Sequence, residues 1–173
     1  MKLTDDDFTL FGLPPAQRLD RAALDDCRRR LQAEVHPDRF ASEGAAAQRV
    51  AMQWAVRVNE AWQRLKDPLS RAAYLCELRG APIAAESNTA MPPEFLLQQM
   101  AWREGLDEAA DAPAVQALDD AVMREERVLH EHLARLLDDE NDPAAAAAQV
   151  RALMFVTRFR EDLARRLDRL ETP

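Results

Sequence analysis

The residues whose types and spacing could do chemistry are His36, Pro37 and Asp38, which follow one another in the first quarter of the chain. With Cys27 nearby, they suggest a thiol hydrolase in which Cys27 is the nucleophile, His36 the base and Asp38 the orienting acid. The spacing argues against it: about two and a half helical turns separate Cys27 from His36, so their backbones lie roughly 13 Å apart. Glycine-rich phosphate loops and oxyanion-hole patterns are also absent from the sequence. We therefore predict that the protein is not an enzyme and has no catalytic residue.

The same tripeptide is well suited to docking. Pro37 restricts the turn, which lowers the entropy cost of ordering it on a partner. Asp38 offers a carboxylate that an arginine can hold through two charge-assisted hydrogen bonds. Three arginines precede the tripeptide: Arg28, Arg29 and Arg30. Their positive charge would steer this part of the protein toward an acidic partner surface.

The elements that must position this loop are two amphipathic helices. Because Pro37 pushes the residue before it out of the helical region, a helix capped by Asp20 should end at about His36. Ser42 is placed to cap the next helix. The apolar positions of the two helices recur at helical spacing and predict an antiparallel hairpin: Leu24, Cys27, Leu31 and Val35 in the first, and Ala47, Val50, Trp54, Val58, Ala61 and Leu65 in the second.

The rest of the chain also favours helix, because alanine, leucine, arginine and glutamate dominate and β-branched residues are few. We expect an all-α protein without sheet. A short helix should end at Gly12, and Asp67 followed by Pro68 should open another that ends near Gly80. Residues 81–93, rich in proline, serine and asparagine, predict a linker. A three-helix bundle should follow, broken at Asp111-Ala112-Pro113 and Asn141-Asp142-Pro143.

This order of elements resembles a J domain: a short helix around Asp7–Leu13, a basic helix, His-Pro-Asp, a long helix and the segment Arg71-Ala72-Ala73-Tyr74. Arg39-Phe40-Ala41-Ser42 and the acidic helical region that follows narrow the resemblance to the HscB family of J-proteins, which acts in bacterial iron–sulfur cluster assembly. The resemblance covers nearly the whole chain. It implies a J domain at 1–76, a short helix end and linker at 77–93, and a scaffold-binding three-helix bundle at 94–173.

The resemblance also implies two partners. One is an HscA/DnaK-type chaperone whose ATPase the J domain stimulates, with His36, Pro37, Asp38 and the three arginines as its contact residues. The other is an IscU-type iron–sulfur scaffold protein. The residues that match the family's scaffold-binding positions are Leu96, Leu97, Met100, Glu104, Glu108 and Phe155.

The residues of the first bundle helix independently suggest a partner site. At 100° per residue, Phe95, Trp102, Leu106 and Ala109 share one side, and Leu97, Met100, Glu104 and Glu108 cluster opposite, with Leu96 flanking. An apolar cluster rimmed by carboxylates is typical of a docking surface. The alternative is a helix buried on both sides. Where the better-known family pattern has a further acidic residue, this sequence has Ala101.

Composition limits the remaining functions. The formal net charge is −8, which is poorly suited to binding nucleic acid. The acidic N-terminus and the lack of a long apolar run predict a cytoplasmic protein that does not bind membranes. Cys27 and Cys76 are expected to be small buried hydrophobes, and His130 and His132 solvated histidines, so we expect no metal and no cofactor. We expect a monomer, with weak self-association left open.

Two rival functions are kept open. One is a general co-chaperone that delivers unfolded clients to DnaK, which a specific scaffold site would contradict. The other is a metallochaperone, which would need three or four clustered ligands. Two isolated cysteines do not supply such a cluster.

Overall fold

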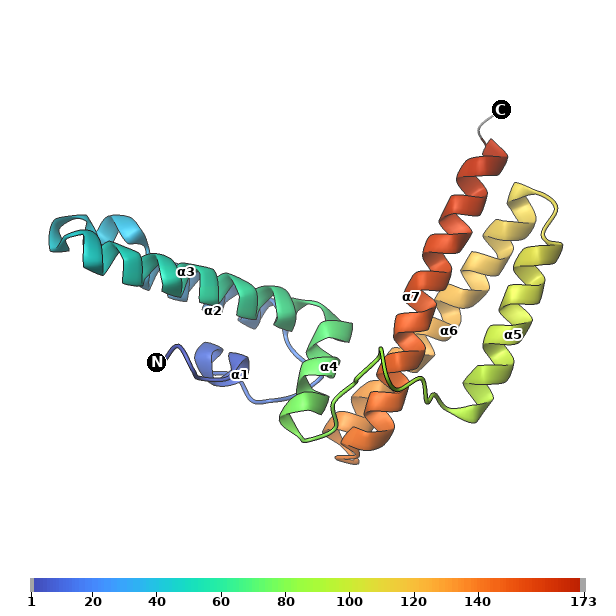
Figure 1. The fold of residues 1–173 in the computed structure, drawn as a ribbon, viewed down its shortest axis with the longest axis horizontal. Coiled ribbons are helices and arrows are strands. Elements are labelled where there is room, and N and C mark those ends of the chain that lie inside the picture. Colours follow the sequence, from blue (N-terminus) through green and yellow to red (C-terminus); the bar gives the residue numbers. More distant parts are fainter. Residues whose placement is uncertain (1, 172–173) are drawn as a thin grey trace. The chain divides into compact units, whose positions relative to one another are not determined.

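The computed structural model describes residues 2–171, apart from the side chains of Pro37, Ala41, Glu43 and Glu171. Helices make up its regular structure, and no strand occurs within these residues, which confirms the predicted all-α class (Figure 1). None of the helices described is long and apolar enough to cross a bilayer. The chain forms two compact units, which divide between Leu75 and Cys76.

The first unit contains α1 (Asp7–Phe11), α2 (Arg21–Glu34), a 3-10 helix η1 (Pro37–Glu43), α3 (Ala45–Lys66) and most of α4 (Pro68–Leu78). The predicted caps of α1, α2 and α4 are confirmed. Gly12 takes a left-handed backbone with φ of 65°, the Asp20 side chain accepts from the Ala22 N–H, and Asp67 accepts from the Ser70 N–H. The prediction for Ser42 is wrong, because Ser42 lies within η1 and α3 begins after Gly44, which offers no side-chain cap.

The hairpin of α2 and α3 supplies the core of this unit. Leu24, Leu31 and Val35 of the α2 segment are buried, as are Val58, Ala61 and Leu65 of α3. The prediction that Val50 belongs to the apolar side of α3 is wrong, because Val50 is 51% exposed. The next residue, Ala51, is buried instead. One residue corresponds to about 100° of helix rotation, so only one of the two can face α2.

The second unit is a bundle of α5 (Pro93–Glu108), α6 (Ala112–Asp138) and α7 (Pro143–Glu171). Its breaks fall where they were predicted, since Asp111 caps α6 and Asp142 accepts a hydrogen bond from the Ala145 N–H at the start of α7. The bundle core includes a stack of apolar side chains from α6 and α7: Val115, Val122, Leu129, Leu133, Val150, Leu153, Val156 and Leu163.

The segment before α5 is hydrogen-bonded to α7 of the bundle. Arg151 of α7 is buried and donates one hydrogen bond to the Ile83 carbonyl and another to the Ala90 carbonyl, at 3.0 and 2.6 Å. The Ile83 side chain is itself buried. The residues between α4 and α5 are therefore part of the second unit's structure.

Candidate functional sites

The first candidate site is the turn between α2 and α3. His36 adopts an extended backbone and caps η1: its Nδ1 accepts a hydrogen bond from the Asp38 N–H at 3.3 Å. That bond requires an unprotonated Nδ1, so the neutral imidazole carries its proton on Nε2. The Asp38 side chain is 91% exposed and its Oδ2 lies 3.6 Å from His36 Nδ1. Pro37 opens η1, but its side chain lies outside the described residues.

The arginines that precede the turn differ in their surroundings. The Arg28 guanidinium lies 3.7 Å from the centroid of the Trp62 ring on α3 and is half-buried, so it takes part in packing α2 on α3. Arg29 pairs with Asp26 on the surface, and Arg30 is exposed with one Nη near Cys27 Sγ. Arg29 and Arg30 are therefore better placed than Arg28 to meet a partner.

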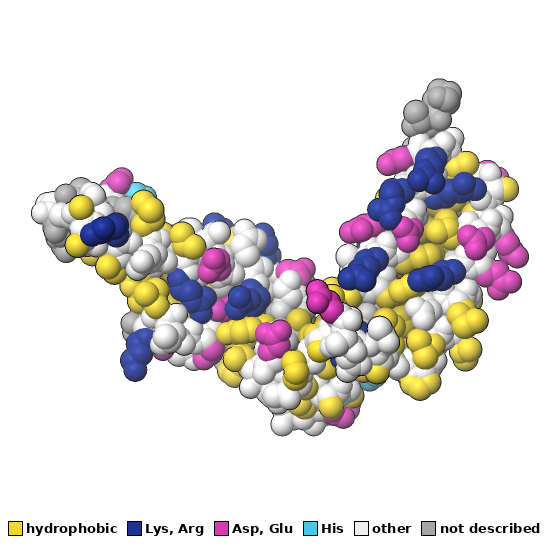
Figure 2. All heavy atoms as spheres, in the orientation of Figure 1, with side chains coloured by type: hydrophobic (Ala, Val, Ile, Leu, Met, Phe, Trp, Pro, Cys, Tyr) yellow, Lys and Arg dark blue, Asp and Glu magenta, His cyan; other side chains and the backbone are white. Residues whose placement is uncertain are grey.

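The second candidate site is the face of α5 directed away from the bundle. Leu97 and Met100 are 72% and 66% exposed, and Leu96 is 41% exposed. Phe95 and Trp102, on the other side of the same helix, are buried. This contradicts the alternative of a helix buried on both sides. Figure 2 shows hydrophobic side chains on the surface around the N-terminal end of α5.

Carboxylates continue this face toward the C-terminal end of α5. Glu104 and Glu108 are exposed, and their spacing from Leu97 and Met100 places all four on one side of the helix. Exposed charges at the edge of an apolar cluster contribute mainly to the rate and specificity of association. We call Leu96, Leu97, Met100, Glu104 and Glu108 the α5 face.

Phe155 of α7 lies beside α5 rather than fully on its outer face. Its ring is half-buried and meets Phe95 edge-on, with centroids 5.8 Å apart, and it stacks on Phe159. Phe155 therefore packs against the buried core through Phe95 and Phe159, while part of its ring stays accessible to a partner.

Comparisons with known proteins agree with this arrangement. Residues 91–164 match the family model described as the HSCB C-terminal oligomerisation domain. The chain is 54% identical over 175 residues to "Co-chaperone protein HscB homolog" of Burkholderia vietnamiensis, which covers 99% of each chain. The chain belongs to the HscB family of co-chaperones.

Two solved structures of HscB proteins share the fold. "Chaperone HscB from Vibrio cholerae" aligns over 96% of this chain and 99% of its own, with a TM-score of 0.78 and 37% identity. The human co-chaperone HscB aligns over 95% of this chain and 83% of its own, with a TM-score of 0.85 and 25% identity. Membership of the HscB family supports a co-chaperone role in iron–sulfur cluster assembly, as the resemblance implied.

Sequence reasoning missed Arg103, which sits beside the α5 face of this HscB chain. Its guanidinium lies 5.2 Å from the centroid of the Phe155 ring and makes a cation–π contact with it. A signal was present in the sequence: Arg103 is the one basic residue in α5, and it follows Trp102 of the buried side. What the sequence could not supply was the position of Phe155, which comes from another helix.

Sequence reasoning also missed the polar contacts that join α3 to α1 and α2. Asp25 on α2 accepts a hydrogen bond from Trp62 Nε1 at 2.7 Å, and this bond, aided by Arg21, lowers the pKa of the Asp25 carboxyl. Asp7 of α1 is fully buried and pairs with Arg57 and Arg64 of α3, at 2.7 and 2.9 Å. Both contacts fix α3 relative to other helices of the same unit.

The two cysteines differ in burial. Cys76 is buried, as expected, and burial raises the pKa of its thiol to about 11. Cys27 is only half-buried, so the expectation of burial is wrong for this residue. Within residues 2–171 there is no group of three or more histidine, cysteine or carboxylate side chains that could hold a metal ion.

Proposed function

We propose that the α5 face and Phe155 bind an IscU-type iron–sulfur scaffold protein, while the turn at His36-Pro37-Asp38 engages an HscA/DnaK-type chaperone and stimulates its ATPase. The single observation that carries this proposal is the exposure of Leu97 and Met100 on α5, at 72% and 66%. A large, adjacent apolar pair on a helix that already buries its other side is costly to leave in water unless a partner covers it.

The chemistry of the α5 face favours a folded partner over a generic unfolded peptide. Its apolar side chains lie on a regular helix, whose backbone groups are already paired and cannot add a strand to an extended client. Exposed carboxylates on one edge, at Glu104 and Glu108, favour a partner surface that is apolar at its centre and basic at its edge.

The chemistry of the turn favours a cationic partner. The Asp38 side chain is 91% exposed, so an arginine can approach both oxygens of its carboxylate. Arg29 and Arg30, on the same helix that leads into the turn, would attract an acidic region beside that arginine. The two sites share one chain, so binding both partners raises the effective concentration of the scaffold at the chaperone.

The test is the ATPase rate of an HscA-type chaperone with the intact chain, with and without scaffold. The Leu97→Ala/Met100→Ala variant should keep the stimulation seen without scaffold and lose the additional stimulation given by the scaffold. Asp38→Asn should lose both. Val128→Ala, which removes a 54% exposed side chain from α6, is the matched control and should behave as wild type.

An unfolded model client replaces the scaffold in a second series. The Leu97→Ala/Met100→Ala variant could lose as much client-dependent stimulation of the ATPase as it loses scaffold-dependent stimulation. In that case the α5 face is a general client site and the scaffold assignment is wrong. If the variant keeps full scaffold-dependent stimulation, the α5 face is not the scaffold site.

A further inference from the structure

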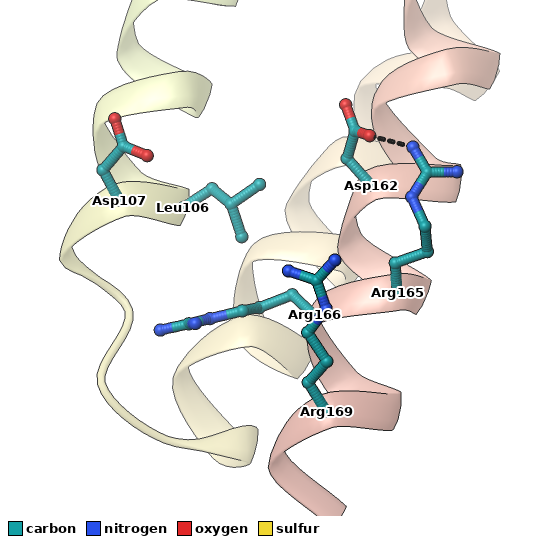
Figure 3. A pocket seen from close by; sticks show the side chains of 6 residues that line it. All are labelled: Leu106, Asp107, Asp162, Arg165, Arg166 and Arg169. Carbon is teal, nitrogen blue, oxygen red and sulfur yellow. Dashed lines mark hydrogen bonds and ion pairs between the residues drawn. The ribbon is translucent and has the colours of Figure 1, made fainter.

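A separate cavity lies between the C-terminal parts of α5 and α7. Its volume is about 310 Å³, and it is lined by Leu106 and Asp107 of α5 and by Asp162, Arg165, Arg166 and Arg169 of α7 (Figure 3). Pockets that hold small molecules have volumes of about 300 Å³ and above. The cavity is therefore large enough for a small ligand.

Two of the three arginines have partners within the protein. Arg165 pairs with Asp162, and Nη2 of Arg166 donates to the Ala109 carbonyl at the end of α5, at 3.2 Å. The first contact neutralises the Asp162 carboxylate, and the second uses one Nη group of the Arg166 guanidinium. They hold both side chains in place at the cavity wall.

Positive charge and donors remain after these contacts. The Arg166 guanidinium donates to a neutral carbonyl, which leaves its charge unbalanced, and Arg169 is an exposed arginine on the same wall of the cavity. Figure 3 shows Arg166 and Arg169 reaching from α7 into the space toward α5, with Asp107 on the far side of Leu106.

We propose that this cavity binds the phosphate group of a small molecule, held by Arg166 and Arg169. A phosphate or phosphate monoester carries about −1.5 to −2 charges at neutral pH, which matches two guanidinium groups better than a single carboxylate does. Planar guanidinium groups also match the oxygens of a phosphate in pairs. Leu106 points from α5 toward α7 and provides an apolar wall for the rest of an esterified ligand.

The proposal is tested on the intact chain with two probes, inorganic phosphate and phenyl phosphate. Binding is measured as a saturable rise in melting temperature and as shifts of the arginine Nε–H resonances, against chloride at the same ionic strength. We expect both probes to bind, and Arg169→Gln to weaken both by about tenfold or more, the effect of losing one charge-assisted contact. Arg127→Gln, which removes an exposed arginine of α6, is the matched control and should bind as wild type.

Leu106→Ala separates free from esterified phosphate. If Leu106→Ala weakens the binding of phenyl phosphate alone, the cavity is assigned to a phosphate ester. If Leu106→Ala leaves the binding of both probes unchanged, the cavity is assigned to free phosphate. The proposal is overturned if neither probe saturates, if chloride reproduces the effect, or if Arg127→Gln weakens binding as much as Arg169→Gln does. These readouts require neither the chaperone nor the scaffold.

Discussion

Phe155 of α7 meets Phe95 of α5 edge-on, with ring centroids 5.8 Å apart. Phe95 is buried and Phe155 half-buried, so this pair connects the core of the bundle to the side of the α5 face. An edge-to-face pair of this kind contributes about 0.5 to 1.5 kcal/mol beyond the area that it buries. Phe155 can therefore serve a partner site only while it also stabilises the bundle.

Truncation should separate Phe155 from the other members of the candidate scaffold site. Leu97→Ala and Met100→Ala should each weaken scaffold binding by about 1 to 3 kcal/mol with little change in melting temperature, because their side chains are mostly exposed. Phe155→Ala should weaken binding and also lower the stability of the bundle, by about 1 to 3 kcal/mol. Calorimetric titration with the scaffold and thermal melts of the same samples check this. A melting temperature of Phe155→Ala equal to that of wild type would contradict the packing seen here.

Substitutions in the turn should remove chaperone stimulation without unfolding the protein. His36→Gln and Asp38→Asn change exposed side chains whose main internal contact is the cap of η1, which is worth about 1 kcal/mol. The ATPase rate of the chaperone and helical circular dichroism measure the two effects. Glu60→Gln, an equally conservative change of an exposed carboxylate on α3, is the control. Stimulation at the wild-type level by either turn variant would exclude the turn as the docking site.

Removing the buried carboxylate of the first unit should be costly. Asp7→Ala removes the buried carboxylate that pairs with Arg57 and Arg64, whose side chains are 20% and 44% exposed. Because both arginines keep contact with water, the cost should lie between about 1 kcal/mol, the limit for an exposed pair, and about 3 to 5 kcal/mol, the cost for a fully buried one. Asp26→Ala removes the exposed pair with Arg29 and should cost less than about 1 kcal/mol. Urea denaturation of the two variants compares them directly. Similar midpoints would show that the Asp7 pairs contribute little.

Stability should fall at alkaline pH through Cys76. Burial raises the pKa of this thiol to about 11 in the folded protein, against about 8.5 in an unfolded chain. The folded state then holds its proton more tightly, so this contribution is complete below the unfolded pKa and is lost as the pH rises through the folded pKa. Cys76→Ala should therefore lose less stability than wild type between pH 8 and pH 10.

The same burial predicts thiol reactivity. At pH 8 an alkylating reagent should modify Cys27, which is half-buried, well before Cys76, because the thiolate is the reactive form. Mass spectrometry of the alkylated chain reads out both sites. Rapid modification of Cys76 in the native protein would contradict its burial.

Local features of the sequence were sufficient for most of the secondary structure. Asp20, Asp67 and Asp111 cap helices through their own side chains, and Gly12 ends one by adopting a left-handed backbone, so each signal acts within a few residues. The outward position of Leu97 and Met100 was also predictable, because helical periodicity alone separates them from Phe95 and Trp102.

Contacts between distant segments were decided only by the tertiary structure. The pairing of Asp7 with Arg57 and Arg64, and the fastening of Ile83 and Ala90 by Arg151, join residues more than 45 positions apart in the chain, and no local pattern encodes such partners. The family resemblance likewise named Phe155 as a candidate site residue but could not show that its ring packs on Phe95 of α5. Its burial depends on where a second helix lies, and that position is set by the packing of the whole bundle.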